Sequence, residues 1–350
     1  MTVGDQLHAL WDRIERTPSR PYSFFAIPND HIIPESNEVE PFFADQHYFQ
    51  VRINQLFLRD QRRWFSKFDP LVFVATEFTY DRAVQLVPYV IGPHLMQKHG
   101  VSQVPFGTMF TNTRVAGIHP YRGGRIVLSL VLCELERENY ARKLLNIVEK
   151  ITSAVDFGLA LGSYVKLSGV ILDGIEALMG SETTKAVMGI RKEFDPEAGD
   201  IFTPGYFVLM DSSGADAKKF WIDDGRLKHG GSLTSISDFR ETDFVLFSVN
   251  QSYERTDIRM LPFYALYEKA KHEASSPETD SWQRAKALIS TVYQGLIVSP
   301  DLTPSQADSL NSDFVDELKR VRQIALNNAS LGKENAQDIR LQKAAELLDL

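Results

Sequence analysis

The segment 139–180, in the middle of the chain, contains no proline and separates two parts of the sequence whose patterns are typical of strands. At about 100° per residue, its large apolar residues fall on one face of a helix, and its glycines fall on the opposite face. The segment therefore predicts a long amphipathic helix or a broken helix pair, around which the rest of the fold is arranged. The apolar face comprises Phe157, Ala160, Leu161, Tyr164, Leu167, Ile171, Ile175 and Leu178.

The opposite face of this predicted helix combines small and charged side chains. Glycines spaced four residues apart allow another backbone to approach closely. We therefore expect an interaction face made of Gly158, Gly162, Lys166, Gly169 and Asp173. Three interpretations of the segment remain open: a buried scaffold helix, a partner-binding face, and a membrane-active segment over 141–180 that proteolysis or a conformational change releases.

A stable membrane span is not expected in this segment. Crossing a bilayer requires about 20 largely uncharged apolar residues. Here the charged residues Asp156, Lys166, Asp173 and Glu176 interrupt the apolar run.

The sequence before this segment predicts an antiparallel sheet. Phe49, Val51 and Ile53 alternate with polar residues, which is the period of a sheet with one solvated face. Further strands are expected within 71–80, 104–112 and 125–136, joined by turns rich in glycine and proline. This spacing favours an antiparallel sheet or a sandwich over a βαβ unit.

Shorter stretches around these strands carry weaker signals. Leu7, Leu10, Trp11 and Ile14 predict a short amphipathic N-terminal helix, and 22–41 is expected to hold at most one edge strand. Pro88 and Pro93 should limit any helix in their region to a short or broken one.

The sequence after residue 180 predicts a second, smaller set of strands. The stretch 183–194 is expected to form a short helix. The segments 205–211, 218–225 and 243–251 then predict a three-stranded meander, which either completes the first sheet or forms its own.

The chain from Leu261 onward predicts helices. An apolar stripe from Trp282 to Leu296 follows a linker at 275–281. Thr303 and Pro304 form a good helix start, and Gly332 is expected to end that helix before a last one at about 334–350.

These patterns together predict an α+β fold. Its parts are a short N-terminal helix with an antiparallel, sandwich-like β domain (1–137), the central helix and small meander (138–258), and a C-terminal helical region (259–350).

Composition indicates a cytoplasmic protein. The net charge of −8 disfavours a nucleic-acid partner. Cys133 is the only cysteine and lies in an apolar run, so we expect a buried, unreactive thiol, no disulfide and a reducing compartment. The first 16 residues lack the continuous apolar region of a secretory signal.

Motifs for chemistry are scarce. The eight histidines follow no zinc-site spacing, and neither a GxGxxG nor a P-loop pattern occurs, so no metal or cofactor is expected. Ser163 and Lys166 have the SxxK spacing of some hydrolases, and Lys228-His229 is the only candidate for a partner motif. Asp223 and Asp224 point in different directions on a strand end and do not form an acid–base pair.

The favoured function is a non-enzymatic protein–protein interaction or assembly protein, an accessory subunit of a larger complex that contacts another protein or a second copy. Its contact surface would be the C-terminal helices or the glycine-bearing face. The alternatives are a membrane-active effector that uses 141–180 and a hydrolase with an unfamiliar site.

Overall fold

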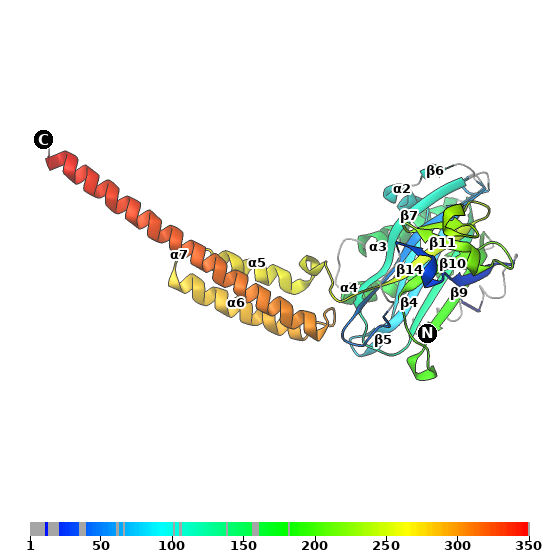
Figure 1. Cartoon of the computed structure of the whole chain (residues 1–350), viewed down its shortest axis with the longest axis horizontal. Coiled ribbons are helices and arrows are strands. Elements are labelled where there is room, and N and C mark those ends of the chain that lie inside the picture. Colours follow the sequence, from blue (N-terminus) through cyan, green and yellow to red (C-terminus); the bar gives the residue numbers. More distant parts are fainter. Residues whose placement is uncertain are drawn as a thin grey trace. The chain divides into compact units, whose positions relative to one another are not determined.

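The chain forms two compact units, Met1–Arg255 and Thr256–Leu350. The computed structural model describes residues 11–12, 21–34, 40–60, 63–65, 67–100, 102–104, 107–137, 139–155, 161–180 and 183–348. The first unit is rich in strands, and the second consists of helices and their connections (Figure 1). The predicted α+β class is therefore confirmed.

Sheet A is the largest sheet of the first unit. Its described strands follow the order β1-β10-β14-β3-β7-β6, and all neighbours pair antiparallel. It combines strands from before and after the central helices, because β10 and β14 lie beside β1 and β3. The strands are β1 (Ser23–Ala26), β3 (Tyr48–Leu58), β6 (Ser102–Val104), β7 (Gly107–Pro120), β10 (Gly205–Met210) and β14 (Phe244–Ser252).

Sheet C packs between sheet A and the central helices. Its described order is β5-β4-β8-β9, formed by β4 (Phe68–Tyr80), β5 (Ala83–Ile91), β8 (Ile126–Glu136) and β9 (Thr184–Phe194). On one face, Phe78 meets Phe49 of sheet A edge to face, with ring centroids 5.1 Å apart. On the other face, the Sγ atom of Cys133 lies 3.6 Å from the Sδ atom of Met179. Each face of sheet C is therefore covered, and its two central strands, β4 and β8, are almost entirely buried.

Sheet B is a small lobe on the opposite side of sheet A. Its described order is β13-β12-β11-β2, with β2 (Ile32–Ile33), β11 (Phe220–Asp223), β12 (Arg226–His229) and β13 (Ser237–Asp238). The side chain of Gln55 in β3 accepts the backbone N–H of Leu227 at 2.9 Å, which ties the two sheets together. A separate apolar cluster, which includes Phe57, Phe220 and Phe244, fills the space between them.

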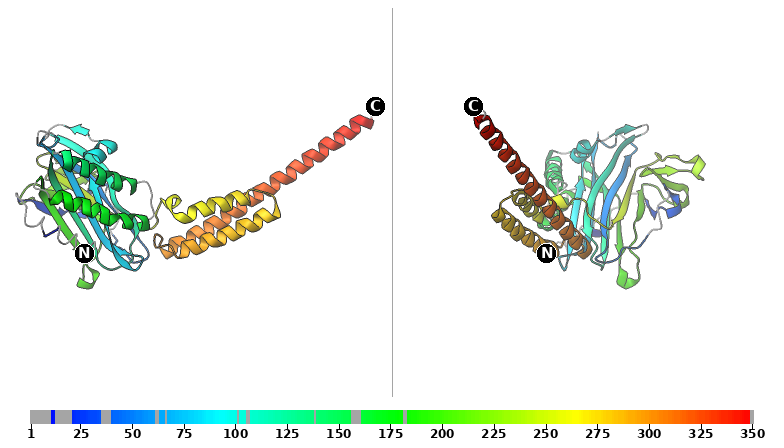
Figure 2. Two further views of the ribbon diagram at one scale, coloured as in Figure 1. Left: turned by 180° about the vertical axis from the view of Figure 1, so that it is seen from behind. Right: turned by 60° about the vertical axis from the view of Figure 1, so that its left-hand side comes forward.

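Helices α3 (Asn139–Val155) and α4 (Leu161–Met179) lie side by side over the outer face of sheet C (Figure 2). The central segment is thus a helix pair. The short helix α2 (Pro93–His99) follows β5 and contacts α3. In α4, the described residues of the predicted apolar face are buried or half-buried: Leu161, Tyr164, Leu167, Ile171, Ile175 and Leu178.

The closest approach between the two helices is at Gly174. A Cβ atom on this residue would lie 2.4 Å from Cγ2 of Val148 in α3. Real Cβ atoms do not come that close to another carbon, so only glycine fits here. The pair is therefore held at a short separation by one glycine of α4 and one β-branched residue of α3.

The second unit is a helical bundle. Its helices are α5 (Pro262–Ala274), α6 (Thr279–Ile297) and α7 (Pro304–Leu348). Tyr267 of α5 stacks on Phe314 of α7 at 3.8 Å between ring centroids, within a core that all three helices share. Among the described side chains of α7, the last buried one is Ala325, and the helix continues to Leu348.

Several local predictions were wrong. The stretch 183–194 forms strand β9, because pairing along β8 outweighs its helix propensity. The expectation that Pro88 and Pro93 allow only a short helix is confirmed, since α2 runs from Pro93 to His99 and Pro88 lies in the edge strand β5.

Two strands, β1 and β2, replace the single edge strand expected in 22–41. The expected meander does not form, since β11 lies in sheet B while β10 and β14 lie in sheet A. The helix expected to stop at Gly332 continues, because one glycine costs a helix only about 1 kcal/mol. The predicted N-terminal helix falls mostly outside the described residues, of which Trp11 and Asp12 are helical.

The contact at Gly174 gives a stability prediction. Gly174→Ala should destabilise the protein by about 1–3 kcal/mol, the usual effect of overpacking a core. Gly169→Ala is the matched control, because its new Cβ would meet nothing within 4 Å. That change should stabilise α4 by up to about 1 kcal/mol through helix propensity. Urea unfolding measures both, and effects of the same sign would contradict the close contact.

Candidate functional site

The predicted interaction residues lie on the outer face of α4. Lys166 and Asp173 are exposed, and Gly162 and Gly169 are half-buried. The hydroxyl of Tyr80 would be 3.8 Å from a Cβ on Gly162, whereas Gly169 has open space beside it. Gly158 lies outside the described residues. The glycine that does receive another helix is Gly174, which sequence reasoning did not select.

An apolar surface runs along the outer side of the α3–α4 junction. Tyr140 and Ile147 of α3 are 75% and 56% exposed, and Val170 of α4 is 52% exposed. At 100° per residue, Tyr140 and Ile147 lie on the side of α3 that Val148 turns toward α4. Val170 likewise lies between Gly174 and the outer face of α4. We call Tyr140, Ile147 and Val170, with the half-buried Leu144 and Ile151, the α3–α4 seam.

The inner side of the helix pair covers polar groups of sheet C. Arg191 Nη2 lies 3.5 Å from Oε1 of Glu77, and both side chains are largely buried. The hydroxyls of Ser129 in β8 and Thr152 in α3 are buried and have no hydrogen-bond partner among the described residues. The interface between α3–α4 and sheet C therefore contains buried polar groups without hydrogen-bond partners in the described part of the chain, and it is less stable than an all-apolar interface would be.

Glu149 attaches α3 to the start of α2. Its side chain is fully buried, and its Oε1 atom accepts the backbone N–H groups of Gly92 and Leu95 at 2.8 and 2.9 Å. Burial raises the pKa of this carboxyl, while the N–H groups of Leu95 and Gly92 and the nearby His94 act in the opposite direction. The carboxyl therefore links α3 to the start of α2, and it is not exposed to a ligand.

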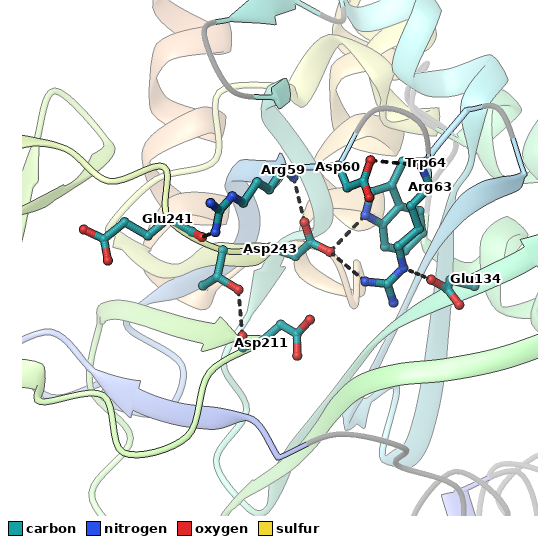
Figure 3. Close-up of polar contacts among 9 residues, drawn as sticks. Arg59, Asp60, Arg63, Trp64, Glu134, Asp211, Glu241 and Asp243 are labelled. Atoms are coloured by element: carbon teal, nitrogen blue, oxygen red, sulfur yellow. Dashed lines mark hydrogen bonds and ion pairs between the residues drawn. The ribbon is translucent and has the colours of Figure 1, made fainter.

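A second buried carboxylate, Asp243, joins the two large sheets (Figure 3). Its Oδ1 atom accepts the N–H of Arg59 at 2.7 Å, and its Oδ2 atom accepts the indole N–H of Trp64 at 2.9 Å. Arg63 lies between this carboxylate and that of Glu134 in β8, and it forms an ion pair with each. The connection from β3 to β4 is thereby tied to β14 on one side and to β8 on the other.

The chemistry of Asp243 is that of a structural link. Burial raises the pKa of this carboxyl, and the donors Arg59, Trp64 and Arg63 oppose that rise. Its side chain is 5% exposed, so no substrate reaches it in this conformation. An open depression nearby is lined by Ser237, Asp238, Arg240 and Glu241. Two of its charged groups pair with each other, since Asp238 binds Arg240 as well as Lys228.

The other titratable candidates are also occupied or buried. Burial raises the pKa of Cys133 to about 12, which keeps the thiol protonated and unreactive. Burial, with Arg255 and Arg114 nearby, lowers the pKa of His119 to about 3, and its ring stacks on Phe78. His119 is therefore a neutral core residue.

The residues of the hydrolase alternative lie on different elements. Lys166 is exposed on α4, while Lys228 in sheet B pairs with Asp238 at 2.7 Å. The side chain of Ser163 is outside the described part of the structure, so the Ser163–Lys166 pair stays a sequence prediction.

Within the described ranges, no group of three or more His, Cys, Asp or Glu side chains is placed to hold a metal ion. None of the helices in the described part of the chain has both the length and the apolar character that crossing a bilayer requires.

Comparisons with known proteins identify no relative. No protein-family model, no curated protein and no solved structure matches the chain. The proposed function therefore rests on the α3–α4 seam.

The sequence contained a signal for the seam that was missed. Apolar residues follow α3 in two adjacent stripes, one through Ala141, Leu145 and Val148 and the other through Tyr140 and Ile147. A helix lying on a sheet buries only one such stripe, so the second was the candidate surface. Glu149 and Asp243 left no comparable signal, because their partners are far away in the sequence.

The buried carboxyl of Glu149 predicts a pH dependence of the protein's stability. A carboxyl with a raised folded-state pKa stabilises the fold below its unfolded pKa of about 4.3, and this contribution is lost as the pH rises through the folded value. Glu149→Gln, a neutral isostere of the protonated acid, should weaken this decline between pH 4.5 and 7.5 in urea unfolding.

Glu149→Ala is the contrasting variant. It leaves two buried N–H groups unpaired and should destabilise the protein at every pH, by about 1–3 kcal/mol for each group. Identical pH profiles for wild type and Glu149→Gln would show that this carboxyl does not control the decline.

Proposed function

We propose that the protein is a non-enzymatic protein–protein interaction or assembly protein, an accessory subunit of a larger complex. The α3–α4 seam is the observation that carries this proposal. Large apolar side chains that are more than half exposed lie together along one helix junction. Burying a Val, Ile or Tyr-sized side chain contributes about 1.5–3 kcal/mol, so even partial burial of three gives a useful binding energy.

The outer face of α4 extends this surface. Lys166 lies about one turn before Val170 in α4, and Asp173 lies about one turn after it. The half-buried Gly162 and Gly169 add no side chain to this outer face. A partner seated on the seam would touch this face at its edge. The proposed site therefore includes Gly162, Lys166, Gly169 and Asp173 of the residues expected from the sequence, as a polar border to an apolar centre.

A cytoplasmic location is part of the proposal. It rests on the single, buried Cys133 and on the negative net charge. The proposal includes no cofactor.

The test is a charge introduced at the centre of the seam. Ile147→Glu should reduce partner recovery in co-purification by about tenfold, because a buried unpaired carboxylate opposes association. The thermal unfolding temperature should hardly change, since Ile147 is 56% exposed. Val84→Glu is the control, at a 67% exposed residue of β5. Equal recovery by wild type and Ile147→Glu would remove the basis of the proposal.

A membrane-active effector is the second candidate. The α3–α4 pair is inserted between β8 and β9, yet these strands pair directly with each other from Ile126 to Leu135. The pair can therefore leave the sheet without breaking a strand ladder. Its incompletely satisfied inner face, with Ser129 and Thr152, lowers the free energy of that release.

Liposome leakage tests the second candidate. If the helices are released, the full chain should cause dye leakage after limited proteolysis within 275–278, the connection between α5 and α6. Gly174→Ala should increase the leakage by loosening the helix pair. Absence of leakage before and after proteolysis would end this candidate.

A further inference from the structure

The seam is a stripe of exposed apolar side chains beside a close contact between two helices. A Cβ atom on Gly174 of α4 would lie 2.4 Å from Cγ2 of Val148 in α3, so the two helices are close together at this point. Tyr140 and Ile147 are seven residues apart, which is about 10.5 Å along α3. This spacing matches apolar residues at i, i+4 and i+7 of a helix laid along the junction.

The border of the seam is mainly basic. On α3, Lys143 and Lys150 are exposed and follow Ile147 around the helix, away from α4. On α4, exposed Lys166 and Asp173 occupy the corresponding positions beyond Val170. Among the described residues, three exposed lysines and one exposed aspartate thus lie beside the apolar centre, in a chain whose net charge is −8. The local charge is opposite in sign to that of the whole chain.

This charge arrangement distinguishes the possible occupants. A second copy seated seam to seam would place its own lysines against Lys143, Lys150 and Lys166, and such like-charge contacts cost several kcal/mol. A bilayer is bound best by a wide apolar face, whereas here three exposed apolar side chains flank a closed helix contact. An acidic partner meets neither objection.

We propose that the α3–α4 seam binds an amphipathic helix of another protein, with apolar residues along one side and acidic residues flanking them. The inference rests on the proposed function and specifies the partner's chemistry. The partner's apolar side chains pack between Ile147 and Val170, and its carboxylates pair with Lys143 and Lys150. The lysines select a partner of negative charge, and the exposed apolar side chains of the seam provide most of the binding energy.

A selection from a helix-biased phage-displayed peptide library, made on the full chain, tests this partner class. Peptides that bind wild type but not Ile147→Glu should be enriched in acidic residues beside an i, i+4, i+7 apolar pattern. One enriched peptide is then measured by fluorescence anisotropy. Lys143→Glu with Lys150→Glu should weaken its binding by about tenfold or more.

The charge-matched control is Lys218→Glu with Lys219→Glu, at two exposed lysines next to sheet B. It should leave the peptide affinity unchanged within about twofold, because the charges are far outside the seam. A second arm measures binding of the full chain to vesicles that contain phosphatidylglycerol, and we expect no dependence on Lys143 or Lys150 there.

Three outcomes would overturn the inference. These are enrichment of basic or extended peptides, no enrichment that depends on Ile147, and vesicle binding that is lost with Lys143 and Lys150. If co-purification still depends on Ile147 in any of these cases, the proposed function stands and only the partner class is wrong. If co-purification does not depend on Ile147, the proposed function itself fails.

Discussion

The contact between Val148 and Gly174 sets the geometry on which the outer surface of the first unit depends. Because the glycine has no side chain, α3 and α4 approach to a distance that any other residue would prevent. Ile147 is the neighbour of Val148 in α3, and Val170 lies one turn before Gly174 in α4, so both exposed side chains flank this helix contact. The fold and the candidate site therefore share one packing constraint.

Apolar packing and hydrogen bonds both hold this helix pair. Apolar residues such as Leu145 and Ile171 bury fully, while Glu149 attaches the end of the pair to α2 through two backbone donors. The sheet beneath does not depend on the pair for its hydrogen bonds, because β8 and β9 pair directly with each other, with one register shift at Leu132–Cys133. The two large sheets are also joined by a buried link, in which Asp243 binds Trp64 and Arg63.

The periodicity of apolar residues correctly predicted those elements in which the local sequence pattern decides which face is buried. The apolar stripe of α4 from Leu161 to Leu178 and the strands at 71–80 and 125–136 follow their own sequence patterns. Predictions failed where tertiary pairing decides the outcome. Residues 183–194 have helix-forming side chains but complete the edge of sheet C, and β11 joins sheet B instead of a meander with β10 and β14.

The candidate site was predictable to the extent that it lies on one helix. The exposure of Lys166 and Asp173 follows from the helical period alone. The seam needed a second fact, that α3 and α4 lie side by side with Val148 against Gly174. The basic border has the same origin, since Lys143 and Lys150 are on α3 and Lys166 is on α4. A sequence with an acidic balance thus presents a basic, apolar-centred face, and that contrast is what makes the partner's charge a property that the fold specifies.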